Sequence, residues 1–452
     1  MKKKLLIICA ILLISNSINS QCWQSVTSGN DNTIAFKTNG TLWIFGSNNC
    51  GQIGDGTSVT KYVPTQIGGN DWSKLSKGGS HTVAIKNNGT LWAWGCNENG
   101  QLGDGTLIGK NIPTQIGTSN NWQSIAVGGF HTLAIKTDGT LWAWGKNGNG
   151  QLGNGQNTNL LIPTQIGVNW QKIATGHAHS LGIKTNGTLW AWGYNVDGAL
   201  GTGNVVDKNV PTQIGSSSGW FNISAGNYHT LALKDSGILY ACGSNYYGQL
   251  GVGNNNDNYY SITQIGTATN WTSIDGGINH SIGLRNNGTI WTCGTNDFSQ
   301  LGTGNLTSYN YTQVGTQTDW VSVSAGGYFS TSKKSDSTIW GWGAGNFGPM
   351  VNNSSSIQTT PSQISCSNLN LTEIETDKSF SIYPNPTKNI LNIQNTNLAK
   401  IDKVVVSDIQ GKIILEVKGD TNQLNVENLE IGLYFINISF SGKNKISKII
   451  KE

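Results

Sequence analysis

The sequence predicts an all-β protein: a seven-bladed β-propeller followed by a small β-sandwich domain. Three observations support this prediction. The 452 residues include 60 glycines and 17 tryptophans but only 12% charged residues, a composition that favours short strands joined by tight turns. Seven similar segments follow one another, and their opening tryptophans lie 48–51 residues apart. After residue 366 the composition changes, with less Gly and Trp and more Ile, Lys and Asn.

The N-terminus has the pattern of a secretory signal peptide, residues 1–20. Three lysines at 2–4 precede a ten-residue apolar run at 5–14, and small Ser20 ends a short polar stretch. The run is shorter than the ~20 residues that a spanning helix needs, and we predict no transmembrane segment. Cys22 would suit a lipid anchor, but bulky Gln21 stands where a lipidation motif has a small residue.

The charges argue against nucleic-acid binding. The net charge is +3 for residues 1–20, +1 for 21–366 and 0 for 367–452, which together make the +4 of the chain. Arg285 is the single arginine. A nucleic-acid binder needs clustered cations against phosphates, and the sequence has no such cluster.

Each repeat predicts four antiparallel strands. In the second repeat these strands follow Trp72, cover 81–86 and 89–95, and end with Pro-Thr-Gln-Ile-Gly at 113–117. Asn88-Gly89 joins the second and third strands, and Asn-Gly is the strongest short signal for a tight hairpin turn. Four strands repeated seven times predict the blades of a propeller, whose closed ring removes exposed sheet edges.

Tryptophans and histidines recur at fixed repeat positions, which favours a structural role. All 17 tryptophans fall on three positions of the repeat, and we expect them to pack between blades. Five histidines lie nine residues after the opening Trp, and we expect each to hydrogen-bond a neighbouring loop rather than a shared metal ion. They are His81, His131, His179, His229 and His280. We predict neither a metal site nor a cofactor.

The pattern GxxHTxAIK…GTLWAWGxNxxGQLGxG resembles the repeat of the regulator of chromosome condensation (RCC1) family over residues 23–365. The resemblance implies a seven-bladed propeller. The last repeat departs from the pattern at Gly345 and Pro349. A blade completed by both ends of the chain is one way in which such a ring could close.

Six cysteines remain after signal cleavage, which leaves fifteen pairings open. Cys22 and Cys366 flank the repeats directly, so a disulfide between them is a candidate lock for the ring. Cys242 and Cys293 share one repeat position; they could pair or could replace larger apolar residues. No cysteine or histidine spacing suggests zinc.

The C-terminal part predicts a linker at 367–378 and a β-sandwich sorting domain at 379–452. Strands are expected at 380–383, 390–393, 403–407, 412–417 and 433–439. The motif residues resemble the type A sorting domain of the bacterial type IX secretion system: Tyr383, Pro384, Asn385, Pro386, Gly411, Gly432 and Tyr434. This resemblance implies contact with the type IX machinery and a secreted or cell-surface protein.

The repeats 21–366 are therefore expected to bind a partner outside the cell. The best-known RCC1 activity, nucleotide exchange on a small GTPase, does not suit an exported chain. An extracellular protein is the preferred partner, a glycan is the alternative, and we expect a monomer. We predict no enzyme, because the propeller has one glutamate, Glu98, and its aspartates are scattered through turns.

Aromatic residues on loops that depart from the repeat are the expected anchors for a partner. The main candidates are Phe130, Tyr194, Tyr228, Tyr246, Tyr247, Phe298 and Tyr328. Further candidates are Tyr259, Tyr260, Tyr309, Tyr311 and Phe347.

Overall fold

A computed structural model describes residues 23–345, 356–364, 380–395, 400–408, 413–440 and 443–452, except residues 256, 305 and 306. The chain forms two compact units, residues 1–366 and 367–452. The described residues fold into strands and turns without a helix, as predicted. The signal peptide, the linker 367–378, and Cys22, Phe347, Cys366 and Gly411 lie outside the described residues.

The first unit contains, in its described residues, seven four-stranded antiparallel sheets, each built from consecutive strands. The first three blades are β1 (Trp23–Ser28), β2 (Asn32–Lys37), β3 (Leu42–Gly46), β4 (Lys61–Ile67); β5 (Trp72–Lys77), β6 (His81–Lys86), β7 (Leu91–Gly95), β8 (Lys110–Gln115); and β9 (Trp122–Val127), β10 (His131–Lys136), β11 (Leu141–Gly145), β12 (Leu160–Gly167). The next two are β13 (Trp170–Thr175), β14 (His179–Lys184), β15 (Leu189–Gly193), β16 (Lys208–Gln213); and β17 (Trp220–Ala225), β18 (His229–Lys234), β19 (Ile238–Gly243), β20 (Tyr259–Gln264). The last two are β21 (Trp271–Gly276), β22 (His280–Arg285), β23 (Ile290–Gly294), β24 (Ser308–Gln313); and β25 (Trp320–Ala325), β26 (Phe329–Lys334), β27 (Ile339–Gly343), β28 (Gln358–Ile364).

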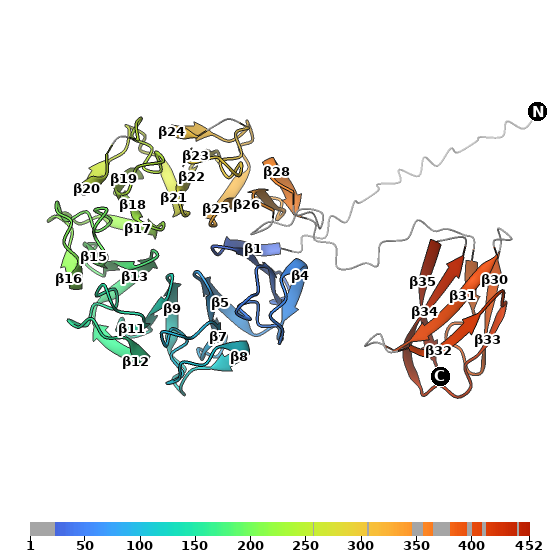
Figure 1. The fold of residues 1–452 in the computed structure, drawn as a ribbon. Helices are drawn as coiled ribbons and strands as arrows, with labels where there is room; N and C mark the ends of the chain where they lie inside the picture. Colours follow the sequence, from blue (N-terminus) through green and yellow to red (C-terminus); the bar gives the residue numbers. More distant parts are fainter. Residues whose placement is uncertain are drawn as a thin grey trace, which may run out of the picture. The chain divides into compact units, whose positions relative to one another are not determined.

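The blades form a ring in which the first strand of each blade lies nearest the centre and the fourth lies outermost (Figure 1). The first blade packs directly against the seventh. The backbone N–H of Ser28 donates to the Ser324 hydroxyl at 2.9 Å, and the hydroxyls of Ser28 and Thr331 are 2.9 Å apart. Every blade is made of consecutive strands, so the prediction of a blade completed by both ends of the chain is wrong. The ring closes by packing between the first and seventh blades instead.

Tryptophans pack between blades, as the repeat pattern predicted. Trp122 and Trp144 of the third blade share a core cluster with Val83 and Leu91 of the second. The opening tryptophans are buried, and so are those of the third repeat position, Trp94, Trp144, Trp192 and Trp342. Since this interface recurs around the ring, the hydrophobic core is a chain of clusters between neighbouring blades rather than a single centre.

The predicted Asn-Gly hairpin turns are present. Gly89 has φ +78°, and an added Cβ would lie 1.9 Å from the Asn120 carbonyl oxygen. Asn88 Oδ1 accepts hydrogen bonds from the Thr90 backbone N–H and hydroxyl, at 3.1 and 2.7 Å. The turn therefore depends on glycine for its backbone conformation and on asparagine for its side-chain bonds.

The second unit contains two sheets in its described residues, with strand orders β29-β30-β33 and β32-β31-β34-β35. The strands are β29 (Phe380–Tyr383), β30 (Ile390–Asn395), β31 (Ile401–Ser407), β32 (Ile413–Lys418), β33 (Gln423–Asn425), β34 (Gly432–Phe440) and β35 (Lys443–Lys451). Both sheets contribute to one core, in which the rings of Phe380 and Phe440 lie 4.7 Å apart. This is the predicted β-sandwich, with two strands that the sequence pattern had not indicated, short β33 and lysine-rich β35.

Candidate functional site

The ring has two different faces. The connections between the first and second strands and between the third and fourth strands lie together at one face, called the loop face here. In the third blade, for example, Lys146 N–H donates to the Phe130 carbonyl at 2.9 Å and so joins these two connections. The opposite face, called the turn face, carries the tight turns between the second and third strands and the links to the next blade.

Below the loop face, side chains of one blade hold a hydroxyl of the next. The Thr132 hydroxyl of the third blade donates to the Gln101 carbonyl of the second blade at 3.0 Å, and His81 Nε2 lies 2.9 Å from the same hydroxyl. Trp144 Nε1 donates to the same Gln101 carbonyl at 3.0 Å. Because the hydroxyl proton goes to the carbonyl, Nε2 of His81 must carry the donated proton, which defines its tautomer.

The other four histidines make the same contact, at 3.0–3.2 Å, with hydroxyls of the next blade: His131 with Ser180, His179 with Thr230, His229 with Ser281 and His280 with Ser330. Burial lowers the pKa of His131 and His229 to about 3, and that of His179 and His280 to about 4. These rings are neutral and connect blades, which agrees with the structural role expected for them. No group of three or more His, Cys, Asp or Glu side chains could hold a metal ion in the described part of the chain.

Cys242 and Cys293 are free, buried thiols, so the alternative of a disulfide between them is wrong and that of a small apolar substitute is right. Each occupies the repeat position that Trp144 occupies in the third blade. The Sγ of Cys242 lies 3.5 Å from the Ala199 carbonyl and that of Cys293 lies 3.5 Å from the Gln249 carbonyl, in each case a carbonyl of the preceding blade. Burial raises the pKa of Cys242 to about 12. Tyr311 is half-buried, and its ring lies 5.1 Å from that of Trp271, against the core cluster between the fifth and sixth blades.

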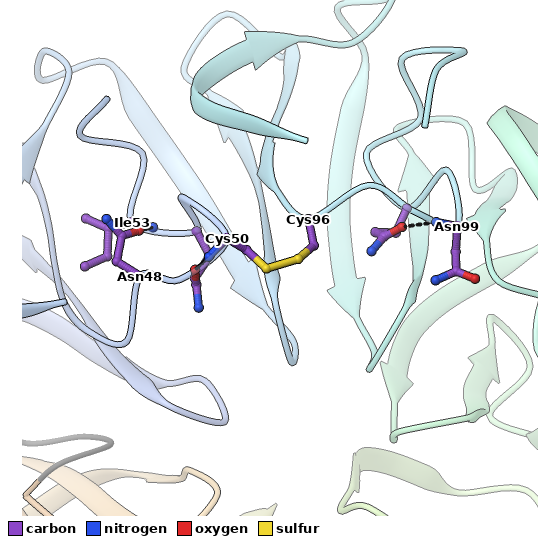
Figure 2. The surroundings of a disulfide bond; sticks show 7 residues. Asn48, Cys50, Ile53, Cys96 and Asn99 are labelled. Atoms are coloured by element: carbon purple, nitrogen blue, oxygen red, sulfur yellow. Dashed lines mark hydrogen bonds between the residues drawn. A yellow bond between two sulfur atoms is a disulfide. The ribbon is translucent and has the colours of Figure 1, made fainter. Parts of the chain in front are cut away.

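Cys50 and Cys96 form a disulfide, with Cα atoms 5.1 Å apart. The sequence alone had not singled out this pair from the fifteen possible pairings. The disulfide links the third-to-fourth-strand connection of the first blade to the residue that follows β7 in the second (Figure 2). Asn48 holds the first connection in shape, since its Oδ1 accepts from the Ile53 N–H at 2.8 Å. The candidate Cys22–Cys366 pair lies outside the described residues and stays a prediction.

A cavity of about 270 Å³ lies on the axis of the ring and is lined by all seven blades. Asp275 is the only carboxylate among its described lining residues. Its oxygens accept from the hydroxyls of Ser224 and Ser324, at 2.6 and 3.0 Å, and from the N–H of Ala325 at 2.9 Å. Burial raises the pKa of Asp275, and these bonds oppose that effect. Asp275 thus joins the fifth, sixth and seventh blades, a role that sequence reasoning missed.

Four rings meet at the loop face beside this cavity, and we call them the aromatic cluster: Phe130, His177, Tyr194 and Tyr228. Ring centroids are 5.6 Å apart for Phe130–His177, 5.9 Å for His177–Tyr228 and 5.6 Å for Tyr194–Tyr228. All four side chains are half-buried. Three were candidates from the sequence; the contribution of His177, which lines the cavity, was missed because it lies off the repeat register.

Charged groups surround the aromatic cluster. Lys146 Nζ lies 5.3 Å from the centre of the Phe130 ring. Burial and, to a smaller extent, Lys146 lower the pKa of His177, which favours the neutral imidazole. Burial, followed by the charge of Asp197, raises the pKa of Tyr194 to about 12, so this phenol keeps its proton.

The remaining aromatic candidates lie apart from the aromatic cluster. Phe298 and Tyr328 form a separate pair with centroids 5.0 Å apart. Tyr246 and Tyr247 are 59% and 45% exposed on the third-to-fourth-strand connection of the fifth blade. On the outer strands, Tyr260 and Tyr309 are exposed and Tyr259 is half-buried.

In the second unit, the motif residue Asn385 binds the edge of β35. Its Oδ1 accepts from the Ile450 N–H at 2.9 Å, and its Nδ2 donates to the Lys448 carbonyl at 2.8 Å. Pro384 and Pro386 follow cis peptide bonds. Tyr434 is buried and donates to the Glu430 carbonyl at 3.0 Å, Gly432 begins β34, and Tyr383 is exposed.

Comparisons with known families agree with this architecture. Residues 71–383 match the RCC1-like domain, and residues 39–85 and 23–52 match the regulator of chromosome condensation (RCC1) repeat. Residues 381–452 match the secretion system C-terminal sorting domain. That domain indicates secretion through the type IX system to the cell surface or the extracellular space. In the described part of the chain, no helix has both the length and the apolar character to span a membrane.

Solved structures share the propeller fold at low sequence identity. Yeast RCC1 (Prp20), solved bound to Kap60, is 22% identical with a TM-score of 0.63, over 68% of this chain and 79% of that one. A second structure of Prp20p from Saccharomyces cerevisiae is 23% identical with a TM-score of 0.63, over 68% of this chain and 81% of that one. Human WBSCR16 gives 16% and 0.65, over 72% and 94%. A search of curated proteins found no match. Through the match over residues 71–383, this chain belongs to the RCC1-like domain family.

Proposed function

We propose that the exported propeller binds an extracellular protein partner at its loop face, with the aromatic cluster as the anchor. The observation that supports this proposal is the contact of four half-buried rings from the third, fourth and fifth blades beside the axial cavity. Half-buried aromatic rings that are held by neighbours offer a large contact area at a small cost in conformational entropy.

The scaffold beneath these rings favours rigid recognition. Phe130 directly precedes His131, whose Nε2 lies 3.0 Å from the Ser180 hydroxyl of the next blade, and Tyr228 directly precedes His229, which is held in the same way. The aromatic cluster therefore stands on the contacts that join the blades. A partner would meet a surface that is already in its bound shape, which lowers the cost of association.

The chemistry of the axial cavity favours binding over catalysis. Asp275, the one carboxylate among the described lining residues, accepts hydrogen bonds from hydroxyl and N–H donors of the two neighbouring blades. A glycosidase would need a second, opposed carboxylate. The yeast relative RCC1 (Prp20) was solved bound to Kap60, and its binding to Gsp1p and histones was studied with its structure. These protein partners are consistent with a protein-binding propeller here.

The test is affinity capture on the immobilised mature chain, residues 21–452, from culture and host extracts. We expect a reproducible protein that is lost with the double variant Phe130→Ala/Tyr228→Ala. The matched control is Tyr62→Ala/Tyr260→Ala, which removes two aromatics from outer strands, where they are 51% and 44% exposed. Equal capture by both variants, with thermal unfolding showing both folded, would contradict the proposal.

A further inference from the structure

The turn face collects cations. In every blade the second strand ends at this face in Lys or Arg: Lys37, Lys86, Lys136, Lys184, Lys234, Arg285 and Lys334. Lys74, Lys172 and Lys333 lie at the same face. Five carboxylates accompany these ten cations, namely Asp71, Asp138, Asp235, Asp319 and Asp336. Over the described residues of the propeller, the turn face therefore has a net charge of +5.

The loop face has the opposite sign. Its strand ends and connections carry eight carboxylates, Asp31, Asp55, Glu98, Asp104, Asp197, Asp207, Asp257 and Asp297. Five cations belong to the same end of the strands, Lys61, Lys77, Lys110, Lys146 and Lys208. The net charge of this face is −3, and Asp275 in the cavity adds one more negative charge. A ring that is almost neutral overall is thus strongly polarised between its faces.

The cations of the turn face are held in place. Lys184 Nζ lies 5.1 Å from the Trp170 ring centre and 4.1 Å from that of Trp190, and this arrangement recurs in other blades. The exposed Lys74 and Lys172 each donate to a carbonyl of the next blade, at 2.5 and 2.6 Å. An ammonium group has three donors, so each keeps further donors for an anion and needs little reorganisation to bind it.

A groove on the same face adds sugar-binding chemistry. It has a volume of about 540 Å³ and is lined mainly by the first and second blades, with Ser124 and Ile125 of the third. Exposed amide and hydroxyl side chains line it together with Lys74 and the half-buried ring of Phe36: the polar ones include Thr38, Asn70, Ser73 and Asn87. Amides and hydroxyls suit sugar hydroxyls, an aromatic ring suits the apolar face of a pyranose, and the ammonium suits a carboxylate or sulfate.

We propose that the turn face binds an acidic polysaccharide, with one sugar unit in this groove and its anionic groups against Lys74, Lys172 and Lys333, whose ammonium groups lie at the surface. The strand-end cations are buried or half-buried, and Lys86, Lys234 and Lys334 form ion pairs with Asp71, Asp235 and Asp319. They therefore add to the positive potential of the face rather than contact the polymer directly. The partner proposed for the loop face would remain accessible, because the two surfaces lie at opposite ends of the strands. An exported protein could therefore hold a glycan at one face and a protein at the other.

The test uses the mature chain and immobilised heparin as the acidic probe. The triple variant Lys74→Gln/Lys172→Gln/Lys333→Gln should weaken binding at low salt on the order of 100-fold, because a lysine near an anionic surface contributes about fivefold. The matched control, Lys61→Gln/Lys110→Gln/Lys208→Gln, removes the same charge from the loop face and should bind as the wild type does. Lys74→Arg/Lys172→Arg/Lys333→Arg should restore binding and shows that the sites tolerate substitution.

Three results would overturn the proposal. Equal weakening by both glutamine variants would show dependence on net charge rather than on the turn face. Absence of heparin binding by the wild type at low salt would remove the acidic polysaccharide as a partner. Tighter binding of a DNA duplex than of heparin at the same salt concentration would assign the basic face to a different class of macromolecule.

Discussion

The Nε2 atom of His131 lies 3.0 Å from the hydroxyl of Ser180 in the next blade, and that hydroxyl donates to the Gln151 carbonyl at 2.7 Å. The proton of the imidazole is therefore donated across a blade boundary. Equivalent contacts occur at every boundary from the second blade to the seventh. These histidines connect blades only while they are neutral, since a second proton would charge a buried ring.

This relationship predicts acid sensitivity. The pKa values of His131, His179, His229 and His280 fall from 6.5 to about 3 or 4 on folding. The unfolded chain therefore binds more protons between these limits, and stability should fall as the pH falls from 6.5 towards about 4. Each histidine should cost on the order of 2 kcal/mol between pH 7 and pH 5, which thermal unfolding at a series of pH values measures.

The variant His131→Phe isolates one histidine, because Phe329 occupies the same repeat position in the seventh blade. On unfolding, this variant should take up one proton fewer than the wild type. Its free energy of unfolding should therefore depend less steeply on pH in the same window. The variant is expected to lose about 1–3 kcal/mol at pH 7 through the missing hydrogen bond. A pH dependence identical to that of the wild type would show that His131 is not neutral when folded.

Asp275 should contribute strongly to stability, because its carboxylate joins three blades. Asp275→Leu would leave the hydroxyls of Ser224 and Ser324 and the N–H of Ala325 without their acceptor, at a cost of about 2–4 kcal/mol. Asp275→Ser restores the residue found at the same position in the neighbouring blades and should cost less. Denaturant unfolding of the two variants provides the comparison, and equal losses would mean that the donors do not depend on the carboxylate.

The disulfide Cys50–Cys96 closes a loop with a sequence separation of 46. In the chain-entropy model, losing it should cost about 4 kcal/mol. Cys50→Ser/Cys96→Ser should therefore lower the unfolding midpoint, whereas Cys242→Ala should not change thiol reactivity in the native state. Alkylation of the native chain followed by peptide mass spectrometry should leave Cys50 and Cys96 unlabelled, and also the buried thiols of Cys242 and Cys293. Labelling of Cys50 or Cys96 would contradict the pairing.

Asn385 should matter to the sorting domain through the edge of β35. Asn385→Ala removes the bonds to the Ile450 N–H and the Lys448 carbonyl and should destabilise that domain by about 1–3 kcal/mol. We expect less protein in the culture medium of a strain that exports this variant, as measured by immunoblotting. Ser381→Ala, which changes an exposed hydroxyl, is the control, and equal secretion of both variants would refute this role.

The repeat was enough to predict the blades, because Trp spacing and Asn-Gly turns define local strands and their order. It was not enough to predict contacts across a boundary. Which groups face one another, as Cys50 and Cys96 do, depends on how neighbouring blades are placed. The same reason hid His177 from the candidate site, since its ring contacts Phe130 and Tyr228 from other blades. Lysine-rich β35 was missed because its alternation resembles a polar tail.

The amino-acid composition also could not predict that the two faces of the propeller carry opposite net charges. A net charge of +1 over the propeller conceals two faces of opposite sign, because Lys ends the second strands whereas Asp and Glu gather in the longer connections. Strand direction alone decides which face a residue joins. The charges could therefore be assigned only when every strand had a direction within the ring.

The most direct test of the account is hydroxyl-radical footprinting of the mature chain, free and bound to its captured protein partner. We expect protection of Phe130, Tyr194 and Tyr228 on binding, with Tyr62 on the outer strand β4 unchanged. Protection confined to the outer strands or to the turn face, with the aromatic cluster as reactive as in the free chain, would contradict it.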